Sequence, residues 1–68
     1  MMKYTMIEEN MQDQDLGAYH TYGIQTDAAA IHDISLNGGA VQTLTRQLNE
    51  LDVSLLHFRD VVEDFLAE

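Results

Sequence analysis

The residue types change character halfway along this 68-residue chain, and that change restricts the fold class more than any other feature. Residues 3–10 and 18–26 are rich in Tyr, Thr and Ile and lack helical spacing, which predicts two strands. The polar segment between them ends at Gly17 and is typical of a hairpin loop. In residues 36–51 and 54–67 the apolar side chains recur at helical spacing, which predicts two helices. We therefore expect one small α+β domain over residues 1–68.

Residues 27–34 fit two interpretations. Their alanines permit a helical turn, whereas Ile31-His32-Asp33-Ile34 permits a third strand at 29–34. We prefer the strand, because a two-stranded hairpin alone is marginal in water and a third strand would extend the sheet. The expected architecture is an antiparallel hairpin or three-stranded sheet, packed on one face by two C-terminal helices.

The helical spacing also predicts which side chains form the helical half of the core. The expected core residues are Leu44, Leu48, Phe58, Val62 and Phe65. Ser35 or Asn37 can cap the first helix and Ser54 the second.

Pairing the two strands about Gln14 places Tyr4 opposite Ile24 and Glu8 opposite His20 on one face. On the reverse face, Ile7 and Tyr19 would then lie diagonally close to each other. Because two helices cover only one face of a sheet, this second face stays open. A chain this short without cysteine gains stability from self-association, so we expect a homodimer with Ile7 and Tyr19 in its interface.

The charge of the chain bears on its partners. Twelve acidic residues oppose three basic ones, for a formal net charge of -9. Such a surface repels phosphate backbones and anionic lipids, so we expect no binding to nucleic acid or to membranes. The N-terminal residues are not typical of a signal peptide, and a cytoplasmic location is the default expectation.

Four segments carry a resemblance to a known family. These are Tyr22-Gly23-Ile24, Asp33-Ile34-Ser35, Leu48-Asn49-Glu50-Leu51 and the stretch from Ser54 to Leu66. Together they resemble a family of short bacterial proteins that is catalogued only as a domain of unknown function. Gly38-Gly39 departs from the charged helix formers expected there, which leaves the start of the first helix uncertain. The resemblance implies no activity for any residue.

The last predicted helix carries the best candidate for a metal site. His57, Asp60 and Asp64 are spaced so that they project from one helix face, and an imidazole with two carboxylates can hold a divalent metal. A solvated acidic helix face explains the same residues. His32 and Asp33 are a weaker pair, because neighbouring residues of a strand point to opposite faces.

These observations favour a non-enzymatic protein-interaction or regulatory module without a cofactor. The expected partners are a second copy of the chain and an unidentified protein. One alternative is an acidic inhibitor, or decoy, of a basic protein that handles nucleic acid. Another is a weak divalent-metal binder through the last helix.

Overall fold

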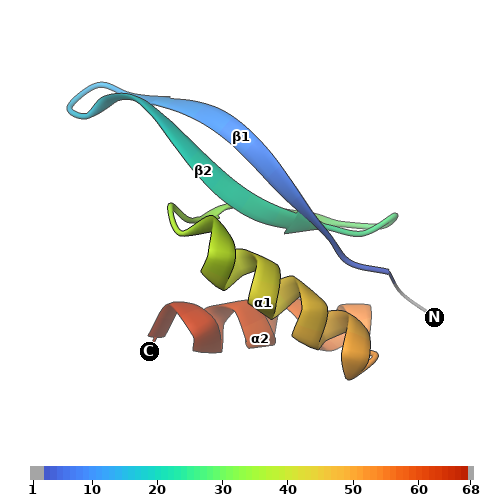
Figure 1. Cartoon of the computed structure of the whole chain (residues 1–68). Helices are drawn as coiled ribbons and strands as arrows, with labels where there is room; N and C mark the ends of the chain where they lie inside the picture. The colour runs from blue at the N-terminus through green and yellow to red at the C-terminus, as the bar shows by residue number, and fades with distance from the viewer. Residues whose placement is uncertain (1–2, 68) are drawn as a thin grey trace.

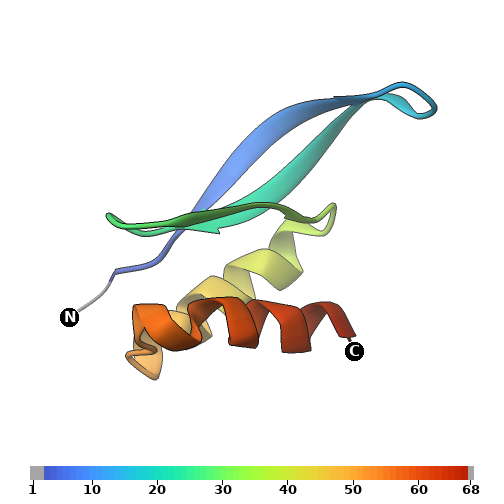
Figure 2. The ribbon, with the colours of Figure 1, turned by 180° about the vertical axis from the view of Figure 1, so that it is seen from behind.

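The computed structural model describes residues 3–67 as a three-stranded sheet with two helices beneath it (Figure 1). In chain order the elements are β1 (Thr5–Asp13), β2 (Gly17–Gln25), β3 (Ala30–Ser35), α1 (Gly38–Glu50) and α2 (Leu55–Ala67). The sheet is antiparallel in the order β1-β2-β3, and both helices lie on the same side of it (Figure 2). The α+β class is confirmed, and residues 30–35 form the third strand rather than a helical turn.

The β1–β2 hairpin is longer than the sequence predicted, and its register differs from the predicted one. Thr5 pairs with Gln25 and Asp13 with Gly17, so Met6 rather than Tyr4 lies opposite Ile24. The Asp13 side chain sets the turn, because its Oδ1 accepts backbone N–H groups of both Asp15 (2.7 Å) and Leu16 (3.1 Å). Gly17 closes the turn at φ +76°, a conformation that glycine adopts without strain. The shift is two residues, so each side chain keeps its predicted face.

β3 has a bulge opposite Gly23, where the backbone of β3 approaches that of β2 closely. Tyr22 pairs with Ser35 and Ile24 with Ile31, which leaves His32, Asp33 and Ile34 to span the gap between the two pairs. A Cβ on residue 23 would lie 2.4 Å from the Ile31 carbonyl oxygen, so only glycine permits this approach.

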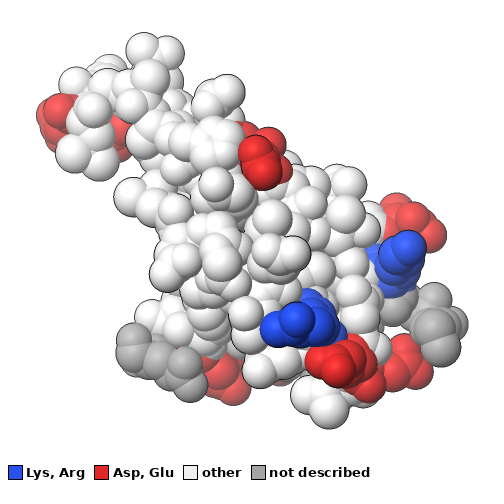
Figure 3. Space-filling model, in the orientation of Figure 1, with Lys and Arg blue, Asp and Glu red and all other residues white. Residues whose placement is uncertain are grey.

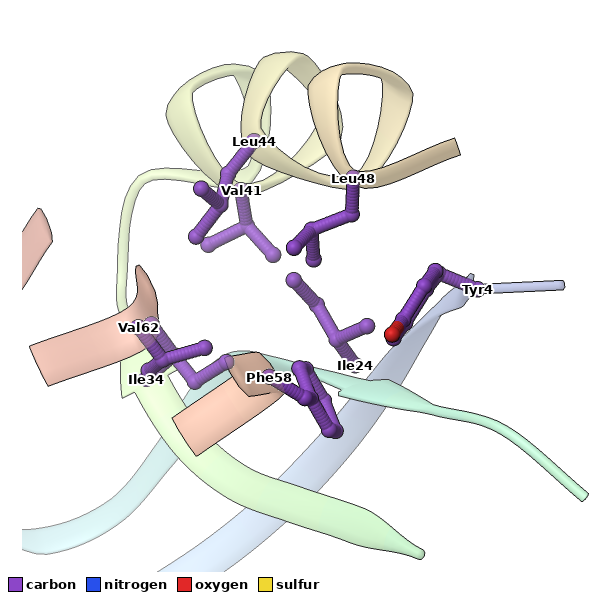
Figure 4. Close-up of a cluster of buried hydrophobic side chains, with 8 residues drawn as sticks. All are labelled: Tyr4, Ile24, Ile34, Val41, Leu44, Leu48, Phe58 and Val62. Carbon is purple, nitrogen blue, oxygen red and sulfur yellow. The ribbon is translucent and has the colours of Figure 1, made fainter. Parts of the chain in front are cut away.

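The core lies between the sheet and both helices (Figure 4). Its buried apolar side chains are Tyr4, Ile24, Ile34, Val41, Leu44, Leu48, Phe58 and Val62. Four of the five predicted helical core residues are therefore confirmed. Phe65, near the end of α2, packs against this cluster but is only partly buried.

The first turn of α1 shows why Gly38 stands where a charged helix former was expected. Asn37 caps the helix, because its side-chain oxygen accepts the Ala40 N–H at 3.1 Å. A Cβ on Gly38 would lie 2.7 Å from the ring of Tyr22, so the aromatic ring occupies the space that a side chain would need. The helix begins here, two residues later than predicted.

The joint between the helices is a Schellman motif. The Val53 N–H donates to the Leu48 carbonyl (3.1 Å) and the Asp52 N–H donates to the Asn49 carbonyl (3.2 Å). Asp52 takes the left-handed position of this motif at φ +51°. The turn reverses the chain, so that α2 returns beneath the sheet beside α1 (Figure 2).

Tyr4 connects the first strand to this joint. Its N–H donates to Asn49 Oδ1 at 2.8 Å, and its carbonyl accepts from Asn49 Nδ2 at 2.9 Å. Its hydroxyl donates to the Val53 carbonyl, and its ring centroid lies 4.9 Å from that of Phe58. Burial and then the charge of Asp52 raise the pKa of the Tyr4 hydroxyl, which keeps it protonated as the donor.

The docking of α2 predicts unequal effects for two substitutions on it. Phe58→Ala removes a 2 % exposed ring and should lower the free energy of unfolding by about 3–5 kcal/mol. Leu56→Ala, at an 82 % exposed position of the same helix, should change it by less than about 0.5 kcal/mol. Thermal unfolding followed by circular dichroism measures both. A Phe58→Ala protein that melts like the wild type would show that α2 is not docked.

Candidate functional site

The outer edge of β1 is one of the two edges of the sheet that have no neighbouring strand, and β3 forms the other. Two hydrogen bonds show which of its backbone groups point outward. The backbone N–H and carbonyl of Tyr4 both hydrogen-bond to the side chain of Asn49 rather than to β2. Just after β2, the Thr26 N–H donates to the Ala29 carbonyl on the β3 side. Backbone groups alternate in direction along a strand, so those of even-numbered β2 residues point toward β3 and those of odd-numbered residues point toward β1. The outward residues of β1 are therefore Met6, Glu8, Asn10 and Gln12.

These four residues leave a row of backbone donors and acceptors available at the edge. Within residues 3–67, no protein group hydrogen-bonds to their N–H or C=O groups on the outer side. The clamp by Asn49 on Tyr4 marks where the row begins. β1 contains neither lysine nor proline, two residues that commonly block such edges. The edge is therefore a template for one more strand.

The acidic side chains in the middle of β1 point back across the sheet. Glu8 Oε2 lies 3.3 Å from His20 Nε2 on β2, and Glu9 Oε2 lies 2.8 Å from His32 Nδ1 on β3. Each imidazole can donate an N–H to its carboxylate. Each carboxylate is therefore directed toward a histidine on another strand of the sheet.

A shallow groove of about 430 Å³ lies between the start of β1 and α1. Its lining residues are Lys3, Tyr4, Thr5, Met6, Gln42, Thr45, Arg46, Asn49 and Glu50. The groove holds two of the three basic residues of the chain, and only Glu50 opposes them. Figure 3 shows a broad uncharged band between the β1–β2 hairpin and the charged groups at the lower rim of this face. A strand added at the β1 edge would place side chains beside this groove.

A second group of polar residues lies on the sheet face opposite the helices. Asp33 accepts hydroxyl hydrogen bonds from Thr21 (2.7 Å) and Tyr19 (2.8 Å). The hydrogen bond from Thr21, and after it the one from Tyr19, lowers the pKa of the Asp33 carboxyl. The bond to Asp33 raises the pKa of the Tyr19 hydroxyl. Asp33 has φ +53°, and the bulge turns both His32 and Asp33 to this face. The expectation that they point to opposite faces was wrong, because it assumed a regular strand.

The predicted interface residues are both on this face but lie farther apart than the predicted register implied. Ile7 lies opposite Gly23, and Tyr19 lies opposite Met11. They are thus four strand positions apart, about 13 Å, rather than diagonal neighbours. Tyr19 is half-buried and is held by Asp33. Their role in a dimer stays a prediction.

The predicted metal residues on α2 form one contact. His57 Nδ1 lies 3.9 Å from Asp60 Oδ2, and both side chains are largely exposed. Over the described range 3–67, no three His, Asp or Glu side chains are grouped to hold a metal ion. Asp64 lies on the same helix beside a small groove shared with Leu44 and Phe65. The structure gives this site no ligand set beyond His57 and Asp60.

Comparison with known proteins places the chain in one family. A family model described as "Family of unknown function (DUF6514)" matches residues 1–68. The chain belongs to this family. No curated protein and no solved structure matches it significantly. Among the described residues, no helix is long and apolar enough to cross a membrane.

Sequence reasoning did not identify the outer edge of β1, because the edge consists of backbone groups that every residue possesses. The order of the three strands was the available signal. A first strand that pairs only with the second must have one free side unless the third strand covers it. Asn49 carried no signal of its own, since its contact with Tyr4 spans 45 residues.

The lowered pKa of Asp33 predicts how acid affects stability. A carboxyl whose pKa is lower in the folded state stabilises the fold above its unfolded pKa of about 3.9, and this contribution is lost as the pH falls through the folded pKa. Asn also tolerates the left-handed backbone, so Asp33→Asn keeps the bulge. The melting temperature of Asp33→Asn should therefore be below that of the wild type at neutral pH, and the gap should narrow below about pH 4.

Thermal melts between about pH 7 and pH 2 measure this difference. Asp27→Asn, which removes the same charge from an exposed turn, is the control for net charge. A gap between wild type and Asp33→Asn that stays constant down to about pH 2 would contradict a lowered pKa at Asp33.

Proposed function

We propose that this protein is a non-enzymatic protein-interaction module that binds an extended segment along the outer edge of β1. The observation that carries the proposal is the row of free backbone groups on Met6, Glu8, Asn10 and Gln12. Addition of a strand to an exposed sheet edge is a common mode of peptide recognition, in which backbone hydrogen bonds supply affinity and side-chain pockets supply specificity.

The shape of the hairpin supports this function. β1 and β2 extend past the helices as an arm, so the outer half of the edge stands clear of the rest of the molecule (Figure 1). At the inner half, the groove beside α1 offers Lys3 and Arg46 as donors and Met6 as an apolar contact. A bound strand would thus meet backbone groups along its length and side-chain contacts at one end.

The polar side chains of the sheet support a binding role better than a catalytic one. Each Asp33 carboxylate oxygen accepts one hydroxyl hydrogen bond, and His32 contacts Glu9. In the described part of the chain, no buried side-chain nitrogen or oxygen lacks a hydrogen-bond partner. These groups hold the bulge together, and none is presented as a nucleophile beside a base.

The acidic decoy is a second candidate, supported by the solvent face of α2. Asp60, Glu63 and Asp64 are exposed there on a chain of formal net charge -9. Such a face attracts a basic partner through long-range forces that salt screens, since the Debye length falls from about 8 Å at physiological salt to about 3 Å at 1 M. A partner held by the decoy face is released by high salt, whereas one held by backbone pairing at β1 is retained.

A proline substitution tests the β1 edge directly. Asn10→Pro removes an outward N–H while leaving the backbone hydrogen bonds between β1 and β2 in place, at a position where edge strands tolerate proline. Ala30→Pro removes an outward N–H from β3, the opposite edge, and is the matched control. In affinity capture from cells that express the protein, the wild type and Ala30→Pro should retain a stoichiometric partner that Asn10→Pro loses.

Circular dichroism melts should show both proline variants folded. Equal retention of the same partner by Asn10→Pro and the wild type would contradict the proposed role of the β1 edge. Release of the partner from all three proteins in about 1 M salt would favour the decoy instead.

A further inference from the structure

We infer that the strand that pairs with the β1 edge is β1 of a second copy of this chain, running antiparallel about a two-fold axis that places Asn10 opposite Asn10. The inference rests on the proposed function, since it names the partner of the same edge. Two-fold pairing of identical edge strands is isologous, so one set of free backbone groups satisfies the other. The two sheets would then join into one six-stranded sheet.

Charge excludes the registers with a two-fold at residue 8, 9 or 11. The acidic residues on and beside the edge are Glu8, Glu9 and Asp13. A two-fold at residue 8 or at residue 9 places identical glutamates directly opposite each other, and a two-fold at residue 11 places Glu9 opposite Asp13. Like charges directly opposite each other destabilise a pair of strands. With the two-fold at Asn10, Glu8 lies opposite Gln12 and Glu9 opposite Met11, so no two carboxylates are directly opposed.

The side chains at the axis are complementary in this register. Asn10 Oδ1 lies 3.0 Å from Nδ1 of His20, whose N–H can donate to it. The Asn10 amide nitrogen is then available to donate to the other copy. The Gln12 amide can likewise donate to the Glu8 carboxylate across the pair. His20 Nε2 also lies 3.3 Å from Glu8 Oε2, so one imidazole contacts the side chains of both Asn10 and Glu8, and it donates to both at once only in its protonated form.

The same register keeps the charged bodies of the two copies apart. The helices lie beneath the start of β1, where Tyr4 contacts Asn49, and the β1–β2 hairpin extends away from them as an arm (Figure 1). Asn10 lies six positions along the chain from Tyr4, about 20 Å of strand, so the two Tyr4 residues are about 40 Å apart. That distance is several Debye lengths of about 8 Å at physiological salt. Repulsion between two chains of formal net charge -9 is therefore weak at this separation.

Single cysteines test the inference, because the natural chain contains none. In the inferred dimer, the two Cα atoms at position 10 are about 5.5 Å apart, within the range of a disulfide. Positions 8 and 12 are each displaced from their own copy by four residues, about 13 Å along the strand. Under mild oxidation, Asn10→Cys should form an intermolecular disulfide at least about tenfold faster than Glu8→Cys or Gln12→Cys.

Sedimentation of the reduced proteins should show a concentration-dependent dimer for each of the three variants. Faster cross-linking at position 8 or 12 would overturn the register. A monomer at high concentration with slow cross-linking at all three positions would overturn the second copy as the partner. After that last result, the proposed function still has its own test, in which the wild type captures a partner that Asn10→Pro loses. Failure of the inference and failure of the proposed function are therefore distinguishable.

Discussion

The clamp between Tyr4 and Asn49 is the contact on which the rest of the structure depends. Its two hydrogen bonds, of 2.8 and 2.9 Å, fasten the start of the first strand to the end of α1. The Tyr4 ring and hydroxyl extend the connection to Phe58 and Val53, so that one residue contacts both helices and their joint. The chain has no disulfides, so this contact helps hydrophobic packing to close the long loop between Tyr4 and Asn49. It also fixes where the free edge of β1 begins.

The elements and most of the core could be predicted from the sequence because they follow local rules. Helical spacing identified Leu48 and Phe58, and alternation placed the side chains of the two predicted strands on their correct faces. The register was wrong by two residues, because Asp13 and Gly17 set the turn through hydrogen bonds and a positive φ that the pattern does not show. The bulge at Asp33 was missed for a similar reason, since it depends on contacts with strands that are distant in sequence.

The candidate site could not be predicted because its chemistry belongs to the backbone. Among the described residues, the side chains predicted as metal ligands form a single long contact, between His57 and Asp60. The free edge arises from topology: β1 is the first strand, and β3 adds to the far side of β2. Glu8 and Glu9 lie on this strand, and their carboxylates contact His20 and His32 on the neighbouring strands. The interaction surface that we propose therefore has no sequence motif.

Amide hydrogen exchange, resolved residue by residue, tests the central claim most directly. In dilute protein, the N–H of Tyr4 should exchange slowly because it is hydrogen-bonded to Asn49. The N–H groups of Ile7, Glu9 and Met11 should also exchange slowly, because they are hydrogen-bonded to β2. The N–H groups of Met6, Glu8, Asn10 and Gln12 should exchange quickly. On association, those of Glu8, Asn10 and Gln12 should become protected. Slow exchange of these amides in the dilute protein, or fast exchange after association, would contradict the account.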